Sequence, residues 1–373
     1  MRPPILYGRQ ILLHDLRDNV AKGGRIVVLR GPSGIGKSEL LRALAMLLAS
    51  RETGSIALLH EIESQAHSLD FLLGDYTAQL LRRSDSLGAN WSDLGVALKR
   101  ATQDHTWSLA AAALLDVAGH FAPQTKKLSE ALVKTLGTEV SPAVTQGAVE
   151  HLLASGRKDL LAGFLLVVKA VSALGMSGCL ILDRLDAASD AVSTAAVALA
   201  TRLPQSWSAI VAINDESLRG LQIRDKIWPE LSYAGGHEQV LSPIQFTAFQ
   251  AWASDRRRST PPFNILQQVF NNCSGRPLFL RDWIEHTSTL AESSPISQSL
   301  EPYYQQRLQR LAAPLIVAFS PGHGFRGGDN MINADEECCN CSASMICWPI
   351  SQFAATWTLF TERAVWVRAA SQI

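Results

Sequence analysis

The sequence predicts an α/β fold, in which a parallel sheet covered by helices is followed by a smaller helical domain. Short apolar runs that suit buried strands alternate with helical segments as far as residue 241. From residue 242 onward the pattern is purely helical, and a proline lies near the start of several segments. We therefore expect a core over 1–241, a helical lid over 242–312, and a tail over 313–373 whose periodicity is too weak to predict a fold.

The order of the elements follows from periodicity and from turn residues. An amphipathic helix is expected to end at Lys22-Gly-Gly24, where the first strand begins. A long helical insert, about 68–175, separates the second strand from the third. The expected strands are 25–29, 55–60, 178–183, 208–215 and 239–241. The expected helices after the first are 38–48, 68–82, 91–101, 106–119, 124–136, 149–174, 189–203, 243–256, 262–272, 277–290 and 302–311.

Composition argues against several functional classes. The 373 residues contain 34 Lys and Arg against 34 Asp and Glu, so the formal net charge is zero. No general basic excess therefore indicates nucleic-acid binding. The most apolar stretches, 110–118 and 160–174, are too short to span a bilayer, and no apolar signal region precedes Gly8. We expect a cytoplasmic protein without a membrane partner.

The most informative segment is Gly31–Ser38, which has the complete pattern of a phosphate-binding loop between a strand and a helix. Its glycines permit a curled backbone that aims N–H groups at phosphate oxygens, and the helix N-terminus adds partial positive charge. Lys37 is the expected cation for the β- and γ-phosphates, and Ser38 the expected hydroxyl for Mg²⁺. The expected ligands are therefore ATP and Mg²⁺. The predicted nucleotide-binding residues here are Gly31, Pro32, Ser33, Gly34, Ile35, Gly36, Lys37, Ser38 and Glu39.

Acidic and amide side chains at the ends of two later strands complete the expected site. Asp183 ends an apolar run and is predicted to support Mg²⁺ together with the hydroxyl of the loop. The next residue is Arg184, which cannot accept a proton from an attacking water. Asp186 either replaces the missing acid or caps the following helix. Asn214 either senses the γ-phosphate or forms a turn. With Lys37, the three residues Asp183, Asp186 and Asn214 form the predicted catalytic set.

Four motifs occur in the order seen in STAND-type signalling ATPases, a group close to the origin-recognition-like AAA+ ATPases. They are Tyr7-Gly8-Arg9, the phosphate loop, the run from Cys179 to Asp186, and Ser274-Gly-Arg-Pro-Leu278. The sequence resembles this family over about residues 5–312. The resemblance implies a P-loop NTPase core, contacts from Gly8 and Arg9 to the base or ribose, and a lid that reaches the nucleotide through Pro277. The sequence departs from the family at Arg184, where many ATPases have a second acid, and in the shortness of the segment after the lid.

The resemblance also implies a function. It implies an ATP-dependent regulatory switch, whose slow Mg²⁺-dependent hydrolysis to ADP and phosphate controls a protein partner or self-association. Two alternatives stay open: a DNA-associated ATPase of the origin-recognition type, and a nucleotide-binding scaffold without turnover.

Two segments keep several interpretations. The basic run Asp255–Arg258 can be interpreted in three ways. It ends a helix in solvent, it supplies an arginine to a neighbouring subunit, or it contacts DNA. The tail over 313–373 is a poorly packed segment, the start of a truncated domain, or a frameshifted end.

Overall fold

The computed structural model describes residues 6–50, 55–63, 68–88, 91–101, 105–122, 129, 159–256 and 261–286. The expected helix 302–311 and the tail 313–373 lie outside this set, and so does the expected helix 124–136 except for residue 129. The chain divides into two compact units, Met1–Leu308 and Gln309–Ile373, and all described residues belong to the first.

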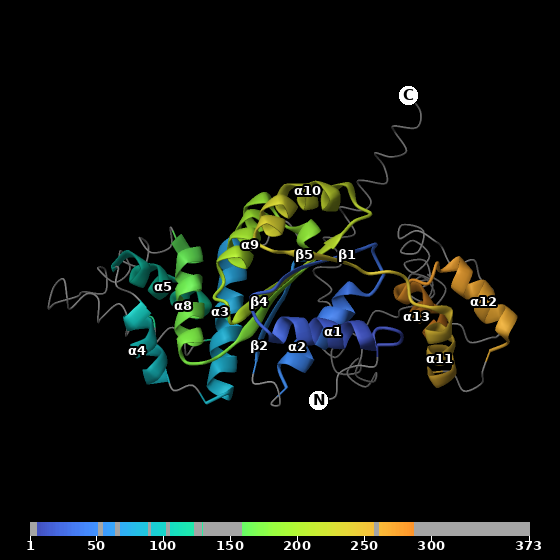
Figure 1. Cartoon of the computed structure of the whole chain (residues 1–373), viewed down its shortest axis with the longest axis horizontal. Helices are drawn as coiled ribbons and strands as arrows, with labels where there is room; N and C mark the ends of the chain where they lie inside the picture. The colour runs from blue at the N-terminus through green and yellow to red at the C-terminus, as the bar shows by residue number, and fades with distance from the viewer. Residues whose placement is uncertain are drawn as a thin grey trace, which may run out of the picture. The chain divides into compact units, whose positions relative to one another are not determined.

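Five parallel strands form the sheet, in the order β2-β3-β4-β1-β5 (Figure 1). Every strand that the sequence predicts is present, and the α/β class with a parallel sheet is confirmed. Because the strands are parallel, the residues that end them meet at one edge of the sheet, as the pairing of Gly31 with Asn214 shows. Their bounds are β1 Ile26–Gly31, β2 Ile56–Glu61, β3 Gly178–Asp183, β4 Trp207–Asn214 and β5 His237–Val240.

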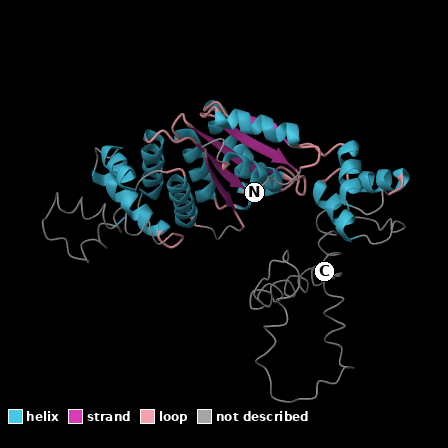
Figure 2. Ribbon diagram, turned by 90° about the horizontal axis from the view of Figure 1, so that it is seen from below, coloured by secondary structure: helices cyan, strands magenta, loops and turns pink. Residues whose placement is uncertain are grey.

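Helices cover both faces of the sheet, as the magenta strands between cyan helices show in Figure 2. Alternate strand residues point to opposite faces, so Val27 and Leu29 join one apolar core while Val28 joins the other. Burial on both faces explains why β1, β3 and β4 are almost continuously apolar, whereas β5 is polar and partly exposed. The first core includes helices α1 (Gln10–Ala21) and α2 (Lys37–Leu48). The second includes α3 (Leu69–Ser86), α8 (Leu160–Ala173), α9 (Asp190–Arg202) and α10 (Leu218–Tyr233).

The expected helical insert is present between β2 and β3. It contains α3, α4 (Trp91–Ala101), α5 (His105–Ala118) and α8. Helix α8 begins at Leu160 because the Asp159 side chain accepts a hydrogen bond from the Ala162 N–H at 3.3 Å. A β-carbon at Gly163 would lie 2.4 Å from the Ala110 carbonyl oxygen, so only glycine permits the close packing of α8 on α5. Among the described helices, none combines the length and apolarity that crossing a membrane requires.

Among the described residues after β5, three helices form the helical lid, with an apolar core of their own. They are α11 (Phe246–Arg256), α12 (Phe263–Asn272) and α13 (Pro277–His286), packed around side chains such as Phe249, Leu266 and Phe279. The segment between β5 and α11 is fixed at both ends. Leu241 N–H donates to Arg30 O at 2.7 Å, and Ile244 N–H donates to Gly275 O at 3.1 Å. The exact domain boundaries expected from sequence stay predictions.

Candidate nucleotide site

The loop between β1 and α2 has the curled backbone that a phosphate requires. Gly34 and Gly36 have φ angles of 77° and 95°, in the left-handed region that side chains disfavour. The first N–H groups of a helix have no carbonyl partner within it, so those of Lys37, Ser38 and Glu39 are donors at the mouth of the loop. The local geometry therefore suits a phosphate group.

Lys37 is held in place against the loop. Its Nζ donates hydrogen bonds to Gly31 O at 2.6 Å and to Pro32 O at 2.9 Å, and the residue is only 9% exposed. Burial lowers the pKa of Lys37, while nearby carboxylates, Asp186 first among them, raise it in opposition. A poorly solvated cation beside a ring of N–H donors favours an anionic ligand.

Asp183 ends β3 and is 1% exposed. Its Oδ1 accepts a hydrogen bond from the Arg184 N–H at 2.8 Å, and the Ser38 hydroxyl also hydrogen-bonds this carboxylate. Its Oδ2 is buried and has no hydrogen-bond partner among the described residues. Burial raises the pKa of Asp183, an effect that the Ser38 hydrogen bond opposes. A hydroxyl, a carboxylate and an unused buried oxygen fit Mg²⁺, which prefers oxygen ligands.

Asp186 and Asn214 both line the cavity, and both also hold the backbone in place. Asp186 Oδ1 accepts a hydrogen bond from the Asn214 N–H at 3.1 Å. Asn214 Oδ1 in turn accepts one from the Glu216 N–H at 3.1 Å. Arg184 adopts a left-handed conformation, with φ of 59°. The geometry therefore gives both predicted residues a backbone contact, and their catalytic roles stay predictions.

The lid contacts the phosphate loop directly. Leu278 N–H donates to Gly34 O at 3.1 Å, and a β-carbon at Gly34 would lie 3.1 Å from Leu278 Cβ. Pro277 is nearby, 3.8 Å from where a β-carbon at Gly36 would be. A glycine at position 34 thus serves both the curled loop and the close approach of α13.

Two ion pairs also connect the lid with the core around the phosphate loop. Arg276 pairs with Glu216, with one contact of 3.1 Å, and the Glu216 carboxylate also accepts the Ser33 N–H at 3.3 Å. Arg281 pairs with Glu39 at 3.1 Å across the cavity. Both arginines come from the lid and both carboxylates from the core, so the two parts attract each other around the loop.

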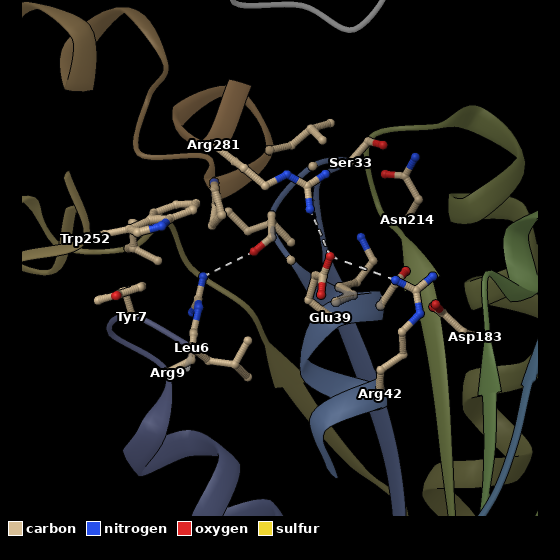
Figure 3. A pocket seen from close by; sticks show the side chains of 18 of the residues that line it. Leu6, Tyr7, Arg9, Ser33, Glu39, Arg42, Asp183, Asn214, Trp252 and Arg281 are labelled. Carbon is tan, nitrogen blue, oxygen red and sulfur yellow. Dashed lines mark hydrogen bonds and ion pairs between the residues drawn. The ribbon is translucent and has the colours of Figure 1, made fainter. Parts of the chain in front are cut away.

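A cavity of about 740 Å³ lies between the phosphate loop and the lid. Figure 3 shows Asp183 and Asn214 on one side of it and Tyr7 and Trp252 on the other. The rings of Tyr7 and Trp252 stack with centroids 5.6 Å apart and an interplanar angle of 12°. One end is thus rich in charge and N–H donors, and the other is aromatic, as a nucleotide with a phosphate chain and a flat base requires.

Arg9 and Gly8 lie at the aromatic end of the cavity, where both make contacts that support the packing of the chain. The Arg9 guanidinium donates to Ile35 O at 3.4 Å and also contacts Ser242 O, and burial lowers the pKa of Arg9. A β-carbon at Gly8, where φ is 72°, would lie only 2.8 Å from Ala248 Cβ in α11. Arg9 lines the cavity, whereas Gly8 supports the packing behind it. Their predicted contact with a base or ribose remains a prediction.

The structure brings most of the predicted site residues to one cavity. Gly31 and Pro32 lie just outside its lining and hold Lys37 through their carbonyl groups. The predicted residues that line the cavity are Arg9, Ser33, Gly34, Ile35, Gly36, Lys37, Ser38, Glu39, Asp183, Asp186, Asn214 and Pro277.

Sequence reasoning missed several residues of this lining. Leu6 and Trp252 belong to no local motif. Tyr7 belongs to the Tyr7-Gly8-Arg9 motif, but only Gly8 and Arg9 of that motif are predicted to bind the nucleotide. Arg256, part of the basic run at the end of α11, also lines the cavity; Arg257 and Arg258 lie outside the described residues. The other missed residues are Arg42, Arg184, Ile244, Leu278, Arg281 and Glu285.

Comparison with known proteins gives one structural match to report. No family model matches the sequence, and no curated protein matches it. Among solved structures, the chain is similar to the crystal structure of Cdc6p from Pyrobaculum aerophilum, with 13% sequence identity and a TM-score of 0.42. The match covers 76% of this chain and 61% of that one, so this chain spans less than two thirds of that structure's length.

Proposed function

We propose that this protein is an ATP-binding regulatory switch and a slow Mg²⁺-dependent ATPase. The observation that carries the proposal is the cavity that the phosphate loop and the lid line together, with Leu278 N–H hydrogen-bonded to Gly34 O. A ligand in this cavity touches both parts at once. Its presence therefore changes the balance between open and closed lid positions, which is the requirement for a switch.

In this proposal, different residues of the cavity bind the phosphates and the base of the nucleotide. Lys37 and the N–H groups of the loop bind the phosphates, and Ser38 with Asp183 holds Mg²⁺, which neutralises charge on the phosphates. Tyr7 and Trp252 offer aromatic surface to the base. The energy of binding is thereby distributed over core and lid, and a partner that prefers one lid position reads the nucleotide state.

Slow turnover follows from the residues next to Asp183. Arg184 cannot act as a base, and one oxygen of Asp186 already accepts the Asn214 N–H at 3.1 Å. The same observation favours the second candidate, a scaffold that binds ATP without hydrolysing it. The two differ in the nucleotide found on the protein after long incubation with Mg²⁺ and ATP: ADP for the slow ATPase, ATP for the scaffold.

Hydrogen exchange tests the switch. With Mg²⁺ and ATP, we expect added protection in the phosphate loop and in residues 270–285 of the lid. The matched control is Lys37→Ala, which should remove both effects because the phosphates lose their cation. Protection of the loop without any protection of 270–285 would contradict the switch and leave only a nucleotide-binding protein.

A further inference from the structure

A second acidic residue lies beside Asp183, on the neighbouring strand rather than on the next residue of the chain. In the parallel pairing of β2 with β3, Glu61 is the register partner of Asp183, and the Ile62 N–H then donates to Asp183 O at 3.1 Å. The Glu61 carboxylate contributes to the raised pKa of Asp183, after burial. The sheet therefore supplies a second acid beside Asp183, whereas the next residue of the chain is Arg184.

Arg42 holds this carboxylate in a two-pronged ion pair. Its Nε donates to Glu61 Oε1 at 2.6 Å, and a terminal nitrogen donates to Oε2 at 2.7 Å. Arg42 lines the cavity, whereas Glu61 does not. The carboxylate is thus bound to an arginine of the cavity lining, and the Arg42 side chain is 47% exposed.

The ion pairs continue from Arg42 to the lid. Arg42 lies 3.9 Å from Glu39, and Glu39 pairs with Arg281 of α13 at 3.1 Å, as the dashed lines of Figure 3 show. Glu39 thus lies between two arginines that both line the cavity. A polyphosphate entering the cavity competes with Glu39 and Glu61 for these two cations, because phosphate oxygens accept the same paired hydrogen bonds.

We propose that Glu61 is the general base for ATP hydrolysis, restrained by Arg42 until the triphosphate draws Arg42 away. The inference rests on the proposed function. In the step, a water oxygen forms a bond to the γ-phosphorus while the bond from that phosphorus to the β,γ-bridging oxygen breaks. The electron pair of the broken bond leaves on ADP. The proton of the water passes to the Glu61 carboxylate and from there to solvent.

The ion pair has two partners, and this makes the proposal testable. If the pair only stabilises the fold, Glu61→Gln and Arg42→Ala break the same contact and have the same effect. If Glu61 is the base and Arg42 its restraint, the two substitutions act in opposite directions. The matched control is Asp190→Asn, which removes an acid from an ion pair with Arg219 between α9 and α10, outside the cavity lining.

The experiment measures turnover, ATP affinity by calorimetry and thermal stability for the full chain and its variants. Glu61→Gln is expected to lower turnover by about 10²-fold, the scale of general-base catalysis, with ATP affinity and the Mg²⁺ requirement unchanged. It should also leave ATP, not ADP, bound after incubation. Arg42→Ala is expected to raise turnover severalfold, and Asp190→Asn to leave turnover unchanged.

Four outcomes overturn the inference. Turnover of Glu61→Gln equal to the wild type would do so, as would equal losses in Glu61→Gln and Arg42→Ala. A loss in Asp186→Asn without one in Glu61→Gln would assign the base to Asp186. If the wild-type protein binds ATP and never hydrolyses it, Glu61 is not a general base, although the nucleotide-binding site stands. Failure to bind ATP at all is a different result, because it refutes the proposed function itself.

Discussion

The two walls of the cavity are built differently. On the core side, Lys37 and Asp183 are almost fully buried and are tied to backbone groups of the loop and of β3. On the lid side, Arg281 is 41% exposed and its partner Glu39 is 44% exposed. A buried charge that loses its partner is costly, whereas an exposed pair contributes little. If the proposed function holds, we expect substitutions in the core wall to change nucleotide affinity and substitutions in the lid wall to change what binding does to the lid.

The largest effect is expected at Asp183. Asp183→Asn keeps the size of the side chain and removes the charge that we propose holds Mg²⁺, so Mg²⁺-dependent turnover should be abolished. ATP binding measured with a chelator in place of Mg²⁺ should be largely retained, because the phosphate loop is intact. Equal turnover in the variant and the wild type would show that the core wall does not hold the metal.

The next effect is expected at Lys37. Lys37→Ala removes the cation that the loop holds, so ATP affinity measured by calorimetry should fall by one or more orders of magnitude. Lys226→Ala is the matched control, because Lys226 is a half-exposed lysine of α10 outside the cavity lining. If both variants bind ATP like the wild type, the buried cation is not a phosphate ligand.

A moderate effect is expected at Asp186, where two substitutions separate charge from hydrogen bonding. Asp186→Asn keeps an oxygen that can accept the Asn214 N–H, whereas Asp186→Ala removes it. Asp186→Ala should lower the free energy of unfolding by about 1 kcal/mol in a denaturant titration, and Asp186→Asn by less. Equal losses would show that the hydrogen bond to Asn214 does not contribute to stability.

A small effect is expected at the lid wall. Arg281→Ala removes a half-exposed ion pair, so the change in unfolding free energy should stay below about 1 kcal/mol and shrink further in high salt. Hydrogen exchange of α13 should nevertheless become faster, because the lid loses one of its attachments to the core. An effect of Arg281→Ala on stability as large as that of Asp186→Ala would remove the distinction between the two walls.

The subtlest test compares one buried cysteine in each part. Burial raises the pKa of Cys179 in β3 far above its ordinary value, and it raises the pKa of Cys273 in the lid to about 12. Both thiols should therefore react slowly with an alkylating reagent at pH 8, since little thiolate is present. Peptide mass spectrometry should show faster labelling of Cys273, slowed by ATP, and no such effect at Cys179. Equal rates would mean that core and lid open together.

Much of the fold was predictable because its signals are local. Apolar runs identified the first four strands, and the expected strand 239–241 overlaps β5 at His237–Val240. The pattern of the phosphate loop predicted that Lys37 lies between a strand and a helix. Asp183 followed from its place at the end of an apolar run. These inferences need only residues that are neighbours in the chain.

The rest of the site depends on contacts between distant segments. The position of Glu61 beside Asp183 follows from the register of β2 and β3, which the separate strand patterns do not specify. Tyr7 and Trp252 meet only because the lid folds back toward the N-terminal segment. The prediction that Asp186 caps the following helix is wrong, because the Ser189 side chain caps α9 by accepting the Val192 N–H. Asp186 instead accepts the Asn214 N–H of β4, a contact between distant segments that the sequence does not contain.

The segment between β5 and the lid limits how the lid can move. Leu241 and Ile244 are fixed by backbone hydrogen bonds, one to β1 and one to the loop that precedes α13. Only Ser242 and Pro243 lie between them, and the ring of Pro243 fixes one of its two backbone torsions. Any opening of the lid that keeps both anchors must therefore use the two torsions of Ser242 and the remaining torsion of Pro243. Arg9 contacts the Ser242 carbonyl oxygen and also donates to Ile35 O of the phosphate loop, so a substitution at Arg9 would free this connecting segment and loosen the loop together.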